Sequence, residues 1–265
     1  MKYLFGQPAR IEKLLNGRFV FILLDYDGTL VPIAKTPQKA VIPEGTKELL
    51  RKLSKRQDRA IGIISGRALG DIKRAVGIKS IIYAGNHGLE IQGPDIRAQR
   101  QVSLRIKPVM RDIAAELRRR LLPVKGVLIE DKGLTLSIHY RLVKKNDLPV
   151  FKKIFFKTSN PYIRAGKIKL NSGKKVYEIK PPVKWDKGKI VLWLASRRQF
   201  ASGENRVLLV YIGDDLTDED AFKALSGKGL TIFVGKPRNS AADYYLKNTK
   251  EVLEFLYLML KLKKR

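Results

Sequence analysis

The sequence predicts an α/β fold, built on a doubly wound parallel sheet with a smaller α+β domain inserted into it. Short, almost wholly apolar runs alternate with amphipathic stretches at helical spacing, as in buried parallel strands joined by crossover helices. Between residues 97 and 180 this alternation gives way to pairs of strands joined by tight turns. We therefore expect a core of residues 1–96 and 181–265 and an inserted domain of residues 97–180.

The first buried strand is the run of six apolar residues at 19–24, which is preceded by a short helix at 11–15. Asp25 and Asp27 follow the strand and flank Tyr26, so strand alternation directs both carboxylates to one side. Open α/β sheets bind ligands at this carboxyl edge. Two carboxylates this close repel each other unless a cation or a shared proton relieves them. We expect a magnesium site here, with one carboxylate free to attack.

The same alternation continues through the next elements, with polar residues at the carboxyl end of each strand. Ser65 follows the second strand, and Asn86 and His87 follow the third. Ser65 could instead cap the next helix, and a lone histidine is usually structural. The expected elements are a helix at 46–53, a strand at 60–65, a helix at 69–76 that Gly77 ends, and a strand at 80–84.

The inserted domain begins with a long amphipathic stretch and continues as a hairpin, a second helix and two short strands. Lys132-Gly133 joins the two strands of the hairpin, which are therefore antiparallel. The expected elements are a helix at 101–122, strands at 127–131 and 134–140, a helix at 146–157, and strands at 168–170 and 175–179.

After the insertion, a second acidic cluster follows another buried strand. An acidic helix N-terminus would explain Asp218 and its two acidic neighbours, but not Asp214 and Asp215, which precede the helix. Both acidic clusters would lie at one edge of the sheet and could share one hard cation. The expected elements are a helix at 187–196, strands at 206–212 and 230–234, and helices at 221–225 and 251–262.

Composition narrows the possible classes of protein. The 265 residues contain no cysteine, which excludes disulfides, thiolate zinc sites and thiol nucleophiles. There are 54 Lys plus Arg against 25 Asp plus Glu, a net charge of +29. This excess permits binding to nucleic acid or an anionic membrane, but it is spread along the chain and favours a solvated surface. With no signal peptide and no run long enough to span a membrane, we expect a cytoplasmic protein.

The ordered motifs resemble the haloacid dehalogenase-like phosphohydrolase superfamily, whose four motifs match Asp25-Tyr-Asp27-Gly-Thr29, Ser65, Lys187 and Gly213-Asp214-Asp215. The resemblance narrows to the trehalose-6-phosphate phosphatase family and covers nearly the whole chain. The residues that carry it are Ser65-Gly66-Arg67, Gly85-Asn-His-Gly-Leu-Glu90, Val127-Leu-Ile-Glu-Asp-Lys132, His139-Tyr140-Arg141, Glu178-Ile-Lys-Pro181 and Gly213-Asp-Asp-Leu-Thr-Asp-Glu219.

The resemblance implies a Rossmann-like (HAD-like) core with a C2-type cap, and Mg²⁺-dependent hydrolysis of trehalose 6-phosphate through an aspartyl-phosphate. Asp25 would be the nucleophile and Asp27 the general acid and base, with Ser65 and Lys187 holding the phosphoryl oxygens. The metal site would comprise Asp25, the backbone carbonyl of Asp27, Asp214 and Asp215, with Thr29 and Asp218 supporting it. The substrate-binding residues implied are Asn86 and His87 at the core edge and Glu130, Lys132, Arg141 and Glu178 in the cap.

Other functions stay open at this stage. A related phosphatase acting on sucrose phosphate or a glucosyl- or mannosyl-glycerate phosphate would share the core and the cap. A basic nucleic-acid-binding protein would use the charge but leave the ordered carboxylates unexplained. A catalytically silent partner of a trehalose-phosphate synthase is a third alternative, against which the intact catalytic residues argue. We expect a monomer that acts on a small sugar phosphate, is functionally coupled to such a synthase, and contacts no membrane.

Overall fold

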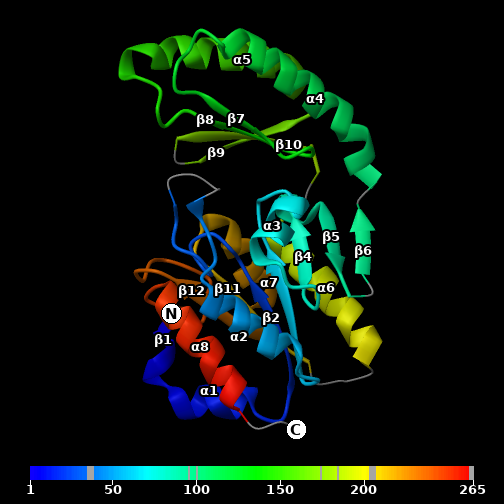
Figure 1. Cartoon of the computed structure of the whole chain (residues 1–265), viewed down its shortest axis with the longest axis vertical. Coiled ribbons are helices and arrows are strands. Elements are labelled where there is room, and N and C mark those ends of the chain that lie inside the picture. The colour runs from blue at the N-terminus through cyan, green and yellow to red at the C-terminus, as the bar shows by residue number, and fades with distance from the viewer. Residues whose placement is uncertain are drawn as a thin grey trace. The chain divides into compact units, whose positions relative to one another are not determined.

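The computed structural model describes residues 1–34, 39–94, 96–99, 101–173, 175–183, 185–202 and 207–262. The chain divides into two compact units (Figure 1). Unit 1 comprises Met1–Ala98 and Trp185–Arg265, and unit 2 is the intervening Gln99–Lys184. Among the described residues, no helix has the length and apolar character that a membrane crossing needs.

Unit 1 is built on one sheet of strand order β1-β13-β12-β11-β2-β3-β4-β5-β6. Neighbouring strands from β1 to β4 pair in parallel, and β5 pairs antiparallel with β4. The fold class predicted from the sequence is therefore confirmed. The strands are β1 (Lys2–Tyr3), β2 (Phe19–Leu24), β3 (Arg59–Ile64), β4 (Ile82–Gly85), β5 (Glu90–Gly93), β6 (Ile96–Gln99), β11 (Val207–Gly213), β12 (Gly229–Val234) and β13 (Tyr244–Leu246).

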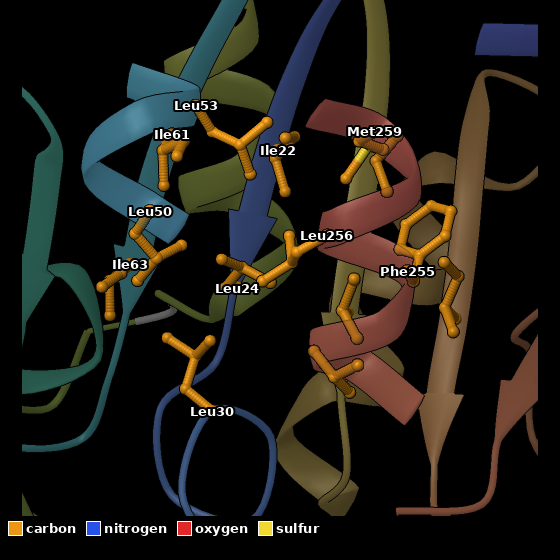
Figure 2. Packing of buried hydrophobic residues seen from close by; sticks show 14 of the residues in the cluster. Ile22, Leu24, Leu30, Leu50, Leu53, Ile61, Ile63, Phe255, Leu256 and Met259 are labelled. Carbon is orange, nitrogen blue, oxygen red and sulfur yellow. The ribbon is translucent and has the colours of Figure 1, made fainter. Parts of the chain in front are cut away.

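Helices cover both faces of this sheet. One buried cluster joins the sheet to the first three helices and the last one, and a second cluster joins its other face to α6 and α7. Figure 2 shows part of the first cluster, with Leu256 of α8 beside Leu24 of β2. The helices are α1 (Pro8–Leu15), α2 (Glu44–Ser54), α3 (Leu69–Val76), α6 (Lys187–Ser202), α7 (Glu219–Leu225) and α8 (Thr249–Lys261), with short 3₁₀ turns η1 (Leu4–Gly6), η3 (Asn86–Gly88) and η5 (Leu216–Asp218).

Strand β2 lies near the middle of the sheet and is buried along its whole length. Val20, Ile22 and Leu24 belong to the first cluster, whereas Phe19, Phe21 and Leu23 belong to the second. The uninterrupted apolar run thus serves two cores at once, which explains why its hydrophobicity does not alternate. Hydrogen bonding to β11 continues past the strand, since the Asp25 N–H donates to the carbonyl of Ile212 at 2.9 Å.

Unit 2 contains a four-stranded antiparallel sheet of order β7-β8-β10-β9, with α4 and α5 together on one face (Figure 1). Tyr177 of β10 stacks on Phe155 of α5 with ring centroids 4.6 Å apart, so odd-numbered residues of β10 face the helices. The elements are α4 (Gln101–Leu121), β7 (Leu128–Asp131), β8 (Leu136–His139), η4 (Lys145–Asp147), α5 (Leu148–Arg164), β9 (Lys169–Gly173) and β10 (Val176–Lys180).

The structure departs from the sequence-based expectations at a few elements. Strands β1, β5, β6 and β13 were not expected; each is no longer than four residues. Helix α5 was expected to end at residue 157, but it continues through Pro161 to Arg164. An Asn-Pro pair is typical of a turn. Here Phe155, Thr158 and Ser159 remain buried, and this buried face keeps the helix going.

Candidate active site

The centre of the site is a buried ion pair at the carboxyl edge of the sheet. Asp25, directly after β2, is 6% exposed, and Lys187 opens α6 and is 3% exposed. The Lys187 Nζ lies 3.0 Å from Asp25 Oδ1 and 2.7 Å from Asp218 Oδ1. Lys187 therefore joins two carboxylates that come from distant parts of the chain. Lys187 is the first residue of α6, and its burial distinguishes it from an ordinary surface lysine.

Asp218 is the best-bonded of these carboxylates. Its Oδ1 accepts from Lys187 and, at 2.5 Å, from the phenol of Tyr211 on β11. Its Oδ2 accepts from the backbone N–H of Asp215 at 2.9 Å, and the exposed Asp215 carboxylate in turn accepts from Leu216 N. The two side chains form a reciprocal capping box at η5. Asp218 thus holds Lys187, while Asp215 holds the turn.

Asp214 approaches the loop after β2 from the end of β11. Thr29 Oγ1 donates to Asp214 Oδ1 at 3.2 Å. Gly28 has a φ of +87°, and a Cβ there would lie only 2.0 Å from Asp214 Oδ2. Glycine is therefore required at residue 28 both for the turn and for the space that Asp214 occupies. The Asp-Gly-Thr segment serves to bring Asp214 against the loop that carries Asp25.

Burial dominates the electrostatics of the cluster. It raises the pKa of the Asp25 carboxyl well above the usual 3.8, against the opposing effect of Lys187. Burial, reinforced by Asp218, raises the pKa of Asp214 to about 7. Burial alone would lower the pKa of the Lys187 ammonium, but its contacts with Asp218 and Asp25 raise it above the usual value. The acids outnumber the one buried lysine among them, so a further cation would favour their ionised forms.

The donor set fits such a cation. One oxygen from each of Asp25, Asp214 and Asp218 lies within 4.8 Å of the others. Hard oxygen donors of this kind suit Mg²⁺ and Ca²⁺ and not softer metals. Because both oxygens of Asp218 already accept hydrogen bonds, Asp25 and Asp214 are the carboxylates best placed to bind a cation directly.

Ser65 and the Asn86–His87 turn form a second part of the site. The Ser65 hydroxyl accepts from the backbone N–H of Arg67 at 3.1 Å, and α3 has Ala68 at its N-cap. The alternative of Ser65 as a helix cap is therefore wrong. Asn86 and His87 both have left-handed backbones, with φ of +51° and +55°. Non-glycine residues rarely adopt this conformation, and it concentrates at functional sites.

The side chains of this turn point to different roles. The Asn86 amide is buried and donates to Glu90 Oε2 at 3.0 Å, which fixes the turn from within. The His87 ring lies against Gly66, where a Cβ would meet its Cε1 at 2.8 Å. His87 is only partly buried, and its backbone N–H donates to the Ser65 carbonyl at 3.0 Å. Of the two, His87 is the better candidate to meet a ligand.

Asp27 is paired differently from Asp25. It bonds Arg67 through both oxygens, Nη2 to Oδ1 at 2.6 Å and Nε to Oδ2 at 2.8 Å. The side chain of Asp27 is 42% exposed and that of Arg67 is 11% exposed. Asp27 is therefore the accessible member of the pair and does not belong to the buried acidic cluster.

The predicted sugar-binding residues of unit 2 are grouped on its sheet. Glu130 of β7 and Glu178 of β10 both pair with Ser137, one from each side. They lie on the face opposite the helices, since they alternate with residues such as Tyr177. Lys132 Nζ is 3.8 Å from Glu130 Oε2, so it shares this face. Arg141 is exposed and follows β8.

Two residues of the site were not given a role from the sequence. Tyr211 could have been noticed, because a tyrosine inside a buried aliphatic strand needs a partner for its hydroxyl. Arg67 was part of a quoted motif, but its side chain was assigned nothing. Its link to Asp27 joins loops that follow different strands, and no spacing along the chain reveals such a pair.

The chain is similar in sequence to known trehalose-phosphate phosphatases. The family model for trehalose-phosphatase matches residues 23–250. Trehalose 6-phosphate phosphatase RA3 of Zea mays is 36% identical over 94% of this chain and 72% of its own length. Trehalose-phosphate phosphatase B of Arabidopsis thaliana is 33% identical over 96% of this chain and 70% of its own.

A solved structure agrees with these relatives. The crystal structure of a trehalose-6-phosphate phosphatase related protein superposes with a TM-score of 0.77 at 25% identity, over 91% of this chain and 96% of that one. The match of the family model takes in every catalytic and metal-site residue predicted from the sequence. The chain therefore belongs to the trehalose-phosphatase family and is a phosphoric monoester hydrolase.

Proposed function

We propose that this enzyme hydrolyses trehalose 6-phosphate to trehalose and inorganic phosphate through an aspartyl-phosphate on Asp25, with Mg²⁺ bound. The observation that carries the mechanism is the buried Asp25 carboxylate, held at Oδ1 by Lys187 beside Asp214. A carboxylate fixed this way can present an oxygen to phosphorus without searching for its orientation. The family and its relatives support the choice of substrate.

In the first half-reaction, an oxygen of Asp25 attacks the phosphorus in line as the sugar oxygen leaves. An acyl phosphate bond forms and the P–O bond to the sugar breaks. Asp27 donates a proton to the departing sugar oxygen, which leaves as a neutral hydroxyl. Lys187 and the Ser65 hydroxyl are placed to stabilise the phosphoryl oxygens, whose charge shifts during transfer.

In the second half-reaction, water attacks the phosphorus of the aspartyl-phosphate. Asp27, now a carboxylate, takes a proton from that water and thereby regains the proton it gave to the sugar. The bond between Asp25 and phosphorus breaks, and the Asp25 carboxylate is restored. One ester and one water are consumed, and one alcohol and one phosphate are produced.

The Asp25 and Asp214 side chains and the Asp27 carbonyl would hold Mg²⁺, with Asp215 and Asp218 supporting this shell. When bound, Mg²⁺ supplies positive charge that neutralises the phosphoryl oxygens. Thr29 steadies Asp214 through its hydroxyl. Asp218 acts at one remove, because it keeps Lys187 in place.

Unit 2 is proposed to be the cap that recognises the sugar. Glu130, Lys132 and Glu178 present acceptors and a donor on the sheet face that the helices leave uncovered. A disaccharide offers many hydroxyls, for which carboxylates and ammonium groups are suitable partners. Arg141 would reach toward the phosphate. His87 would contact the substrate from unit 1, with Asn86 holding its turn.

Phosphate release across a panel of sugar phosphates, with and without Mg²⁺, tests this function. We expect the highest kcat/KM on trehalose 6-phosphate and loss of turnover when Mg²⁺ is removed by EDTA and regained when it is added back. A higher kcat/KM on sucrose phosphate or on a glycosyl-glycerate phosphate would contradict trehalose 6-phosphate as the substrate. Full turnover in EDTA would contradict the requirement for Mg²⁺.

Binding of Mg²⁺ is expected to strengthen as the pH rises toward neutral. The pKa of Asp214 is raised to about 7, so below that pH a proton must leave before the carboxylate can bind the metal. The apparent dissociation constant should fall as the pH rises toward 7, by about tenfold per pH unit for each proton that the metal displaces. Isothermal titration calorimetry from pH 5 to 8, with buffers of different ionisation enthalpy, would also detect the released proton. A flat affinity across this range would contradict the prediction.

Replacing Glu130 by alanine is expected to raise KM for trehalose 6-phosphate about tenfold to a hundredfold, because a charged acceptor to sugar hydroxyls is lost. Hydrolysis of 4-nitrophenyl phosphate, which has no sugar, should change less than about twofold. Glu116→Ala is the matched control, since Glu116 lies on α4 and pairs with Arg120 four residues on. An equal loss on both substrates would show that the substitution damages the enzyme generally.

A further inference from the structure

Arg67 makes a contact that the proposed mechanism does not use. Its guanidinium forms a two-point bond with the Asp27 carboxylate, at 2.6 and 2.8 Å. Such fork-to-fork pairs are the strongest and most directional of the charge-assisted hydrogen bonds. Because Asp27 is the proposed acid and base, a residue that occupies both of its oxygens must affect both proton transfers.

Arg67 is anchored from several sides. Its guanidinium carbon lies 4.8 Å from the centre of the Tyr26 ring, a cation–π distance. The Tyr26 ring is fully buried, and its hydroxyl donates to the carbonyl of Ala40 at 3.0 Å. The Arg67 backbone N–H donates to Ser65 Oγ, and its carbonyl accepts from Asn86 N at 2.7 Å. The arginine is thus the fixed member of the pair.

Asp27, by contrast, is partly exposed where the chain enters a turn. Its neighbour Gly28 donates to the Val31 carbonyl at 2.7 Å, which closes the turn just after Asp27. The Asp27 side chain, which bonds Arg67, is four-tenths exposed. The anchored arginine therefore determines where this carboxyl group lies.

The two-point geometry fixes where the Asp27 carboxylate points. A carboxylate accepts a hydrogen bond at each of its oxygens, and the Arg67 fork donates to both. Because the guanidinium is anchored, the Asp27 side chain is confined to one orientation. A group that transfers a proton at one defined place acts faster when it is already held in that direction.

We infer that Arg67 is a positioning residue, which holds the Asp27 carboxyl group in the orientation that its proton transfers need. This inference rests on the proposed function and deepens it. In the second half-reaction the pair aims the carboxylate, which then receives a proton from water. Arg67 itself gains and loses no proton.

The test compares kinetics in a double-mutant cycle of Arg67→Gln, Asp27→Asn and the combined variant. Arg67→Gln should lower kcat on trehalose 6-phosphate about tenfold to a hundredfold with little change in KM. In the Asp27→Asn background, Arg67→Gln should lower kcat by less than about twofold, because the carboxylate that Arg67 positions is already absent. Arg67→Lys should recover only part of the loss, because an ammonium cannot make the two-point pair.

A second substrate separates positioning from general damage. The 4-nitrophenolate ion leaves without a proton, so Asp25 is phosphorylated by 4-nitrophenyl phosphate without an acid. Hydrolysis of the aspartyl-phosphate still needs Asp27 as the base. Arg67→Gln should therefore show a rapid burst of about one 4-nitrophenolate per active site and then a slow steady rate. A structural defect would lower the burst and the steady rate together.

Arg56→Gln is the matched control. Arg56 makes the same two-point pair with Asp58, at 2.8 and 2.7 Å, and its side chain is similarly buried at 9% exposed. Arg56 lies before the start of β3, whereas Arg67 lies after its carboxyl end, where the site is. Replacing Arg56 should therefore lower the free energy of unfolding and leave kcat unchanged.

Three results would overturn the inference. They are additive losses in the double-mutant cycle, an increase in KM with kcat unchanged, and a burst that falls with the steady rate. The role of Arg67 can be tested even if trehalose 6-phosphate is not the substrate, because the cycle and the burst can both be measured on 4-nitrophenyl phosphate alone. An enzyme that hydrolyses the aryl ester but not trehalose 6-phosphate would contradict the proposed substrate and would leave the test of Arg67 intact.

Discussion

Replacing Asp25 by asparagine is expected to abolish turnover while leaving the fold intact. The amide lacks the negative oxygen that attacks phosphorus, so kcat should fall at least about a thousandfold. Asparagine has nearly the same shape, and burial already disfavours the charge of Asp25, as its raised pKa shows. Lys187 keeps its ion pair with Asp218 at 2.7 Å, so the buried ammonium is not left without a partner.

Two measurements check this expectation. Phosphate release reports the activity, and acid-quenched labelling with ³²P-substrate reports the aspartyl-phosphate, which should be absent from the variant. The midpoint temperature of thermal unfolding should change by no more than a few degrees. Asp71→Asn is the control, because Asp71 lies on the surface of α3 and pairs with Arg74. Retained turnover in Asp25→Asn would contradict the covalent mechanism.

Replacing Lys187 by methionine is expected to cause the largest loss of stability among the site variants. The substitution keeps most of the length of the side chain but leaves Asp25 and Asp218 buried without their shared cation. Removing one partner of a buried ion pair costs about 3–5 kcal/mol in free energy of unfolding. Activity should fall as well, because no ammonium remains to hold the Asp25 oxygen or stabilise the phosphoryl group.

The loss should depend on pH in a defined direction. Without Lys187 the pKa of Asp25, already raised above its usual 3.8, rises further, because the cation that lowers it is gone. The folded state then binds more protons than the unfolded state at every pH between 3.8 and that raised value. Unfolding free energy should therefore fall as the pH rises through this window, and the variant should be least impaired in mild acid.

Urea unfolding at several pH values, without divalent metal, checks this prediction. Lys189→Met is the control, because Lys189 lies two residues further along the same helix and makes a more exposed pair with Asp186 at 3.3 Å. It should change stability by less than about 0.5 kcal/mol at every pH. A Lys187→Met variant as stable as the parent would mean that the buried carboxylates find another partner.

Much of the fold and of the buried cluster follows from sequence because their signals are local. The apolar run at 19–24 is typical of a strand buried on both faces, and residues at the end of such a strand lie at the carboxyl edge. Gly77 ends α3 with a left-handed backbone, as its position after an amphipathic stretch indicates. The same reasoning places Asp25 and Asp214 at one edge of the sheet, whereas Lys187 was assigned to the site through the family resemblance.

What could not be predicted depends on where side chains turn after the backbone is placed. Asp218 looked equally suited to a helix N-terminus and to a metal shell, and only its bonds to Lys187 and Tyr211 distinguish it. Arg67 could point in many directions from its loop. Strands as short as β13 gain their place from neighbours already in the sheet and have no periodic pattern of their own.

The pairing of β2 with β11 sets the order in which this enzyme becomes active. These adjacent strands are separated by most of the chain, including all of unit 2. Closing so long a loop is entropically costly, and long-range parallel pairing is slow to form. A chain still emerging from the ribosome has Asp25 but lacks Lys187, Asp214 and Asp218. Phosphatase activity should therefore appear only after Asp218 has been synthesised and β11 has paired with β2, with no partially active nascent form before that point.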